Sequence, residues 1–410
     1  MILTFARQPR MQTPLAVAAA LVLAAGLTVA AEQFWPSRGA VIRAADLTPE
    51  TIVATVKTGA TAAPPALRAA LAASRAAPDD TALALLAAEA LIAEGRAIGD
   101  ARLVGASLSI LQTALAQHDP QAQTLAGIAR QYQHDFSASL AMLDQAIATD
   151  PRNIRALLNR ATVQSVLGEL DRASADCVAL QQLGQVQVAF LCQSTALILT
   201  DNAGTVRQRL EAILASPGTL DPSLTGWATG LIGEIAAIQG DSATAMARFA
   251  EVLATDPAAI RERLLLADLM LAEGDGAGVL ALLKGQPETD SLLLRRTLAY
   301  RQTGARRSEQ ADSAELARRF QQNIALGLTA HAREEARYFL AIAADPVQAL
   351  DRAQVNWALQ HEWEDAQLLI EAAMAVGQPA AARPVVDWMQ TQGLTGLLRQ
   401  VPPAIREAGQ

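Results

Sequence analysis

Histidines, neighbouring acids and serine motifs are the first places to look for chemistry in this chain, and their spacing argues against most of it. Neighbouring acids such as Glu334–Glu335 and Glu364–Asp365 would diverge by about 100° on a helix, which is too far apart for a catalytic pair. No serine-nucleophile, phosphate-loop or dinucleotide motif occurs in the sequence. The histidines are scattered, and none has the spacing that puts two metal ligands on one helix face: His118, His134, His331 and His361. We therefore expect no catalytic residue, no metal and no cofactor.

The acidic residues that flank two of these histidines have a simpler explanation than acid–base chemistry. Carboxylates follow both His331 and His361, and acidic residues in a first helical turn are favoured by the helix dipole. We interpret both places as helix starts.

Cys177 and Cys192 are the two cysteines of the chain. This number excludes a cysteine-rich zinc module and an iron–sulfur cluster. The two residues lie about equally far from a turn near Gly184, so their sulfurs can reach similar heights on adjacent antiparallel helices, and a disulfide is possible. Cys177 also occupies a core position, where an unpaired cysteine is an ordinary buried residue. Both states stay open, and the core position favours two buried thiols.

The charge of the chain argues against nucleic acid as a partner. The formal net charge is -8, and Lys and Arg form no continuous stripe of the kind that follows a phosphate backbone. Hydrophobic residues make up 51% of the chain and aromatic residues 4%. Alanine and leucine dominate, which favours many closely packed helices over sheets.

The first 31 residues read as a targeting segment. Arg7 and Arg10 precede an uncharged run from Pro14 to Ala31, which fits either a cleaved signal peptide or a transmembrane anchor. In both cases the positive charge before the run places the rest of the chain beyond the membrane. We expect a periplasmic protein or one on the outer face of the inner membrane, with membrane contact only if the segment is kept.

Internal repeats are the strongest signal of what positions these residues. Residues 134–151 read HDFSASLAMLDQAIATDP and residues 240–257 read GDSATAMARFAEVLATDP, with the same acidic second residue and the same ending. The turn residue of this unit recurs with spacings of 34, 72, 34 and 103, close to multiples of 34: His134, Gly168, Gly240, Gly274 and Gly377.

Two columns of the repeat support helix-on-helix packing. Seven residues before the turn stand small residues, with Ile370 as the exception: Gly127, Ala161, Gly233 and Ala267. Nine residues after it stand larger ones: Leu143, Cys177, Phe249, Leu283 and Val386. In these columns the chain resembles the tetratricopeptide repeat family, whose unit is a pair of antiparallel helices. The early tryptophan of that family is missing, so the repeats are divergent.

The resemblance implies an all-α fold, a right-handed superhelical solenoid of antiparallel helix hairpins, because each hairpin leaves an apolar face that only its neighbour can cover. We expect a linker at 32–65, the solenoid at 66–400 and a tail at 401–410. The regions around 62–120 and 291–363 are helical by pattern but off register, with breaks near Gly99, Gly304 and Asp345–Pro346.

The resemblance also predicts a partner groove lined by the first helix of each unit. The residues at groove positions combine charge with aromatic anchors: Tyr132, Arg155, Asn159, Trp227, Glu234, Arg261, Asp268 and Glu371. The first hypothesis is a non-catalytic scaffold or assembly factor of the bacterial cell envelope that binds a protein or peptide in this groove. The alternatives are a helical module associated with cell-wall lytic or polymer-export enzymes, and a structural spacer without a specific ligand.

Overall fold

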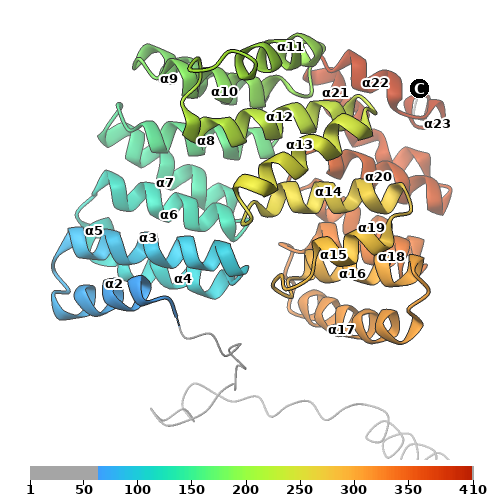
Figure 1. Cartoon of the computed structure of the whole chain (residues 1–410), viewed down its shortest axis with the longest axis horizontal. Helices are drawn as coiled ribbons and strands as arrows, with labels where there is room; N and C mark the ends of the chain where they lie inside the picture. Colours follow the sequence, from blue (N-terminus) through green and yellow to red (C-terminus); the bar gives the residue numbers. More distant parts are fainter. Residues whose placement is uncertain (1–62, 409–410) are drawn as a thin grey trace, which may run out of the picture. The chain divides into compact units, whose positions relative to one another are not determined.

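The computed structural model describes residues 63–408, and this part of the chain is built from helices without a strand (Figure 1). The predicted targeting segment and most of the predicted linker lie outside it. The first half of the array contains α2 (Pro65–Ala76), α3 (Thr81–Ile98), α4 (Ala101–Ile110), α5 (Gln112–Ala116), α6 (Pro120–Tyr132), α7 (Phe136–Thr149), α8 (Ile154–Val166), α9 (Leu170–Gln182), α10 (Val186–Leu197), α11 (Ala203–Leu214), η2 (Pro222–Leu224), α12 (Thr225–Ile238), α13 (Ser242–Thr255) and α14 (Ile260–Ala272).

The second half continues the same arrangement with more irregular lengths. It contains α15 (Gly276–Leu282), α16 (Asp290–Gln302), α17 (Arg306–Ala325), α18 (Ala332–Ala341), α19 (Pro346–Trp357), α20 (Trp363–Val376), η3 (Pro379–Ala382), α21 (Arg383–Thr391), α22 (Thr395–Gln400) and α23 (Pro403–Arg406). Neighbours in sequence pack as hairpins, for example α6 with α7, α12 with α13 and α18 with α19. The predicted all-α solenoid of helix hairpins is thereby confirmed.

The turn between the two helices of a hairpin explains why the repeat begins as it does. Gly240 has a φ of 78° and His134, at the same place in its copy, a φ of 59°, in the left-handed region that glycine enters freely and histidine only occasionally. The acidic residue that follows caps the second helix. Asp135 accepts a hydrogen bond from the Ala138 amide and Asp241 from the Thr244 amide.

The small and large columns face each other across each hairpin. A Cβ at Gly233 would lie 2.6 Å from the ring of Phe249, and one at Gly127 would lie 2.7 Å from Leu143. Because neither position has room for another carbon, glycine here allows two helices to approach until the large side chain fills the gap. Phe249 and Leu143 are both fully buried.

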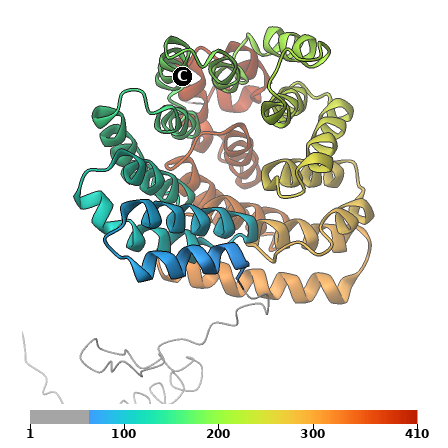
Figure 2. The same ribbon diagram turned by 60° about the vertical axis from the view of Figure 1, so that its left-hand side comes forward.

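The C-terminal helices turn back against the middle of the array. Figure 2 shows them enclosed by the helices of residues 150–270. The His361 amide donates to the Val166 carbonyl at 2.7 Å, and the Gly396 amide donates to Asp201 Oδ1 at 2.7 Å. We call these contacts, between residues 361–396 and residues 166–201, the closure. It joins parts of the chain that are almost 200 residues apart.

The end of the array lies later than the sequence suggested. Val401 and Ile405 are buried, and α23 falls inside the segment expected to be a tail, because these two side chains complete the apolar contacts of α21 and η3. Within residues 63–408 no helix is long and apolar enough to cross a membrane.

Candidate partner-binding cavity

A partly open cavity of about 430 Å³ lies where the closure meets the middle of the array. Its walls come from α8, α10, α12 and α14, the first helices of successive hairpins, and from the segment that enters α20. Most of the lining is apolar, including Leu158, Trp227, Leu231, Leu265 and Trp363. The volume and the lining are typical of sites that bind a small molecule or a few side chains of a peptide.

The closure forms one wall of this cavity and is held there by polar contacts to the end of α8. The ring Nδ1 of His361 donates to the Leu167 carbonyl at 2.8 Å, and the Trp388 indole donates to the Gly168 carbonyl at 3.2 Å. A Cβ at Gly168 would lie 2.4 Å from that indole nitrogen, so this turn needs glycine for the approach of Trp388 as well as for its positive φ. Burial lowers the pKa of His361, which favours the neutral ring.

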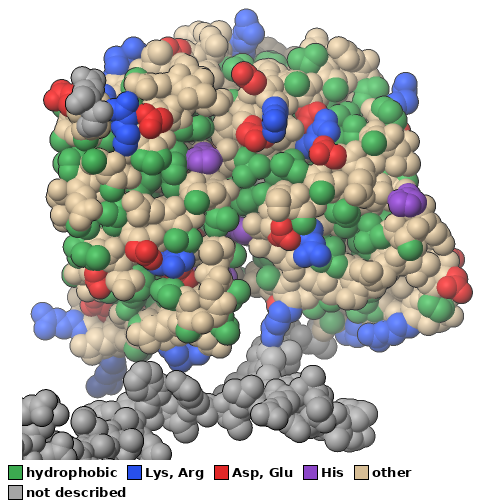
Figure 3. All heavy atoms as spheres, turned by 180° about the vertical axis from the view of Figure 1, so that it is seen from behind, with side chains coloured by type: hydrophobic (Ala, Val, Ile, Leu, Met, Phe, Trp, Pro, Cys, Tyr) green, Lys and Arg blue, Asp and Glu red, His purple; other side chains and the backbone are tan. Residues whose placement is uncertain are grey.

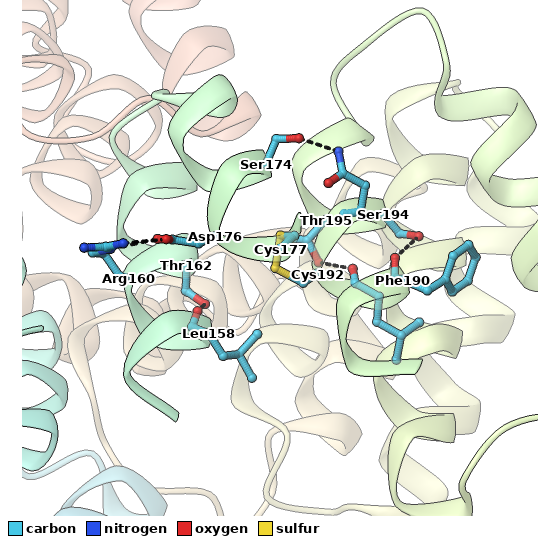
Figure 4. Close-up of a disulfide and its surroundings, with 12 residues drawn as sticks. Leu158, Arg160, Thr162, Ser174, Asp176, Cys177, Phe190, Cys192, Ser194 and Thr195 are labelled. Atoms are coloured by element: carbon cyan, nitrogen blue, oxygen red, sulfur yellow. Dashed lines mark hydrogen bonds and ion pairs between the residues drawn. A yellow bond between two sulfur atoms is a disulfide. The ribbon is translucent and has the colours of Figure 1, made fainter. Parts of the chain in front are cut away.

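The disulfide lies beside the cavity. Cys177 of α9 and Cys192 of α10 are bonded, with their Cα atoms 5.5 Å apart. Figure 4 shows Cys192 on the same helix as Thr195 and near Leu158 and Thr162, and all four of these residues line the cavity. The structure thus has a disulfide where the core position of Cys177 favoured two thiols. The disulfide and the core position are compatible, because Cys177 stays buried at the large-residue position of its hairpin while it is bonded to Cys192.

Arg261 is the centre of the charged rim. It reaches Glu234 of α12 at 2.8 Å, Glu362 at 3.1 Å and Glu364 at 3.8 Å. These carboxylates, Glu234 first among them, raise the pKa of Arg261 well above its usual range. Burial raises the pKa of Glu362, but Arg261 and Arg333 outweigh burial and lower it to about 2. Glu362 is therefore a fixed negative charge at the rim.

Arg333 of α18 ties the start of α20 from the other side. It bonds Glu362 at 2.5 Å and Asp365 at 2.6 Å. The side chain of Asp365 is fully buried and also accepts a hydrogen bond from the side-chain Nδ2 of Asn356 at 2.6 Å. Burial raises the pKa of Asp365, so this carboxylate depends on Arg333 for its charge.

A second cluster of ion pairs continues along the first helices. Asp268 of α14 meets Arg295 of α16 at 2.6 Å and Arg337 of α18 at 2.8 Å. Burial alone would raise the pKa of Asp268, but the two guanidinium groups outweigh it and the pKa is lowered. Figure 3 shows, on the face opposite to that of Figure 1, several acidic and basic side chains beside one another, together with basic side chains that stand alone near the edge.

Half of the predicted groove residues gather at or near the cavity. Trp227, Glu234 and Arg261 line it, and Asp268 belongs to the neighbouring ion-pair cluster. Trp227 donates its indole N–H to Thr195 at 3.3 Å. The three charged residues are engaged with other parts of the same chain, a role that the groove prediction did not include.

The other four predicted residues lie elsewhere and do not line the cavity. Tyr132 packs against the core of α3, α4 and α6, and Arg155 pairs with Glu89 at 2.7 Å while Asn159 donates to the Arg155 carbonyl. Glu371 is exposed on α20. These residues follow the groove columns of the family, but the structure does not unite them in one site.

Sequence reasoning missed the wall that the closure provides. The sequence predicts only a helix start at His361, Glu362, Trp363 and Glu364, and α20 does begin at Trp363, with reciprocal capping by Glu362 and Asp365. Their contact with α8 and α14 has no local signal, because it depends on how far the array turns over nearly 200 residues. Among residues 63–408 no group of three or more His, Cys, Asp or Glu side chains is placed to hold a metal ion.

Comparison with known proteins gives structural likeness without a sequence match. No family model and no curated protein matches the chain. A tetratricopeptide repeat protein from Parabacteroides merdae is 17% identical, covering 70% of this chain and 98% of that one, with a TM-score of 0.35. Human IFIT1, solved as a dimer with m7Gppp-AAAA, is 10% identical, and the match covers 84% of this chain and 86% of that one, with a TM-score of 0.42. Yeast Tom70 is 10% identical, and the match covers 82% of this chain and 84% of that one, with a TM-score of 0.37.

The packing of the hairpins themselves carries the assignment of the fold. A small residue on the first helix faces a large residue on the second, a left-handed turn joins them, and the unit repeats along the chain. The described part of this chain is an α-solenoid of tetratricopeptide-like repeats.

Proposed function

We propose that this chain is an exported scaffold of the bacterial cell envelope that binds a partner protein at this partly open cavity. The observation that carries the proposal is the cavity itself, which has apolar walls from four first helices and a charged rim that includes Arg261. Apolar pockets with a few fixed polar groups are the usual form of a binding site.

Two independent features support a location outside the cytoplasm. The N-terminal sequence has basic residues followed by an uncharged run, as in export signals. Cys177 and Cys192 are joined by a disulfide, and such bonds form and persist mainly in oxidising compartments such as the periplasm. Sequencing the N-terminus of the mature protein, and finding no free thiol after unfolding without reductant, would support this part of the proposal. Two free thiols would contradict it.

The charged groups around the cavity support binding rather than catalysis. Glu234, Arg261 and Glu362 form ion pairs that join separate helices, and His361 is held by the Leu167 carbonyl. Groups tied in this way fix the shape and charge of a surface.

Site-specific photo-cross-linking tests the proposal in the cell. Thr162 lines the cavity and is exposed, so a photoreactive residue placed there should cross-link to a specific envelope protein. Thr113 on α5 is exposed but does not belong to the cavity lining, and the same substitution there serves as the matched control. The cross-linked protein, once identified and purified, should bind the purified chain directly.

The proposal fails if Thr162 and Thr113 give the same products, or if the identified protein does not bind when purified.

A further inference from the structure

The rim of the cavity carries more negative charge than its own cation can balance. Four carboxylates line the cavity, from Glu234, Glu262, Glu362 and Glu364, together with one guanidinium, that of Arg261. Arg261 is already shared among three of them. Arg333, behind Glu362, is taken up by Glu362 and Asp365. The free side of the cavity is therefore acidic.

Of the four lining carboxylates, Glu262 is the one that does not pair with Arg261 or Arg333. It is half-buried, lies beside Gly230 and has no ion-pair partner within residues 63–408. A partly buried carboxylate without a cation is costly, and here it borders an apolar space large enough for a ligand. Glu364 is the next most available, since its contact with Arg261 is the longest of the three, at 3.8 Å.

The apolar walls and the acidic rim together define the chemistry of the occupant. Leu158, Ile198, Trp227, Leu231 and Leu265 offer contact to a large apolar group. An anionic amphiphile would place its charge among four carboxylates, which like-charge repulsion disfavours. A cation next to the apolar group would instead restore the balance at Glu262 and Glu364.

We propose that the cavity binds a peptide segment of the partner in which large apolar side chains are followed closely by lysine or arginine. The apolar side chains enter the space between α8, α12 and α14, and the cation lies at the rim formed by Glu262 and Glu364. This inference rests on the proposed function and adds to it the class of sequence that the scaffold recognises.

Three capped peptides test this selectivity by isothermal titration calorimetry with the full-length protein. They have the sequence Ala-Leu-Leu-Phe-X-Ala, where X is lysine, glutamine or glutamate. The lysine peptide should bind at least about tenfold more tightly than the glutamine peptide, and the glutamate peptide should bind most weakly, because electrostatic complementarity separates them.

Variants locate the binding on the protein. In the double variant Glu262→Gln and Glu364→Gln, the preference for lysine over glutamine should fall to less than about threefold. Thr162→Phe should abolish binding of all three peptides by filling the cavity, and Thr113→Phe should leave it unchanged. Circular dichroism checks that each variant is folded.

Several outcomes would overturn the inference: no binding of the lysine peptide, equal binding of the three peptides, or a lysine preference that survives in the double variant. The proposed function is tested separately by cross-linking at Thr162. If the cross-linked partner binds but the peptides show no charge preference, the scaffold role stands and the sequence class is wrong. If no partner exists and the peptides also fail, both are wrong.

Discussion

The hairpins of this chain and its closure both bury apolar side chains, but the closure adds polar contacts between segments far apart in the sequence. Within the hairpin of α12 and α13, Phe249 fills the space left by Gly233, and this contact is between apolar groups. In the closure, backbone amides bond to Val166 and Asp201, the His361 ring bonds to the Leu167 carbonyl, and the Trp388 indole bonds to the Gly168 carbonyl. Arg333 holds the start of α20. The first interface joins neighbours in sequence and the second joins distant segments.

This difference indicates that the two interfaces can fail separately. Apolar packing between neighbouring helices should survive the loss of the closure, because each hairpin is covered by the next one. The cavity should not survive it, since one of its walls arrives with residues 361–364. The following predictions test whether the hairpins and the closure are independent, beginning with the largest effect.

Phe249→Ala should destabilise the hairpin of α12 and α13 most strongly. Removing a fully buried ring costs about 3–5 kcal/mol through lost burial and the cavity that remains. Urea unfolding measures the change in free energy. If the loss is below about 1 kcal/mol, the small and large columns do not carry the packing of the hairpin.

Arg333→Ala should open the closure while the hairpins of the first half stay folded. The variant leaves Asp365 buried without its cation, at a cost of about 3 kcal/mol. Hydrogen exchange at the His361 and Gly396 amides should quicken, whereas amides within α12 and α13 should not change.

Arg318 is a suitable control for this experiment, since it is exposed and pairs with Glu315 on its own helix. Arg318→Ala should leave hydrogen exchange at the closure unchanged. Equal effects of the two variants, or faster exchange throughout the chain with Arg333→Ala, would show that the closure is not a separate unit.

Gly233→Ala should cost about 1–3 kcal/mol, because its new methyl group meets the ring of Phe249 and overpacks the hairpin. Gly226 lies on the same helix, and a methyl group added there would have no neighbour within 4 Å. Gly226→Ala should therefore be neutral or stabilise by up to about 1 kcal/mol through helix propensity. Similar values for the two variants in thermal unfolding would rule out a special role for the tight approach.

Acid should weaken the ion pairs of the first helices, with the smallest effect of the four. The pKa of Asp268 in the folded protein is lowered from 3.8. Its ionised form therefore adds stability above about pH 4, and this contribution is lost as the pH falls through the folded value. Stability should fall as the pH drops below about 4, and Asp268→Asn should reduce this slope. An unchanged slope in the variant would assign the acid sensitivity to other groups.

The repeat units could be predicted from the sequence because their signals are local. The acid after each turn, the small residue at Gly233 and the large residue at Phe249 recur with a fixed spacing, and each acts on a partner within one hairpin. The breaks expected near Gly99 and Gly304 likewise follow helix ends, and Pro346 begins α19, since glycine and proline act on the backbone where they stand.

The candidate site could be predicted only in part. Trp227, Glu234 and Arg261 were found because they follow the groove columns of the family. The partners of Arg261 at Glu362 and Glu364 were not, because no sequence pattern records the accumulated rotation that brings α20 back to α14. For the same reason, Tyr132 and Glu371 were grouped with them although they do not line the cavity.

The closure also sets how many repeats this chain can have. In an open solenoid, a hairpin can be gained or lost with little effect on distant units, because each unit contacts only its neighbours. Here the Gly396 amide must meet Asp201 and Trp388 must meet Gly168. Adding or deleting one hairpin between them would carry these groups past their partners. The contacts that give the cavity its fixed form therefore also fix the number of hairpins between residues 201 and 396.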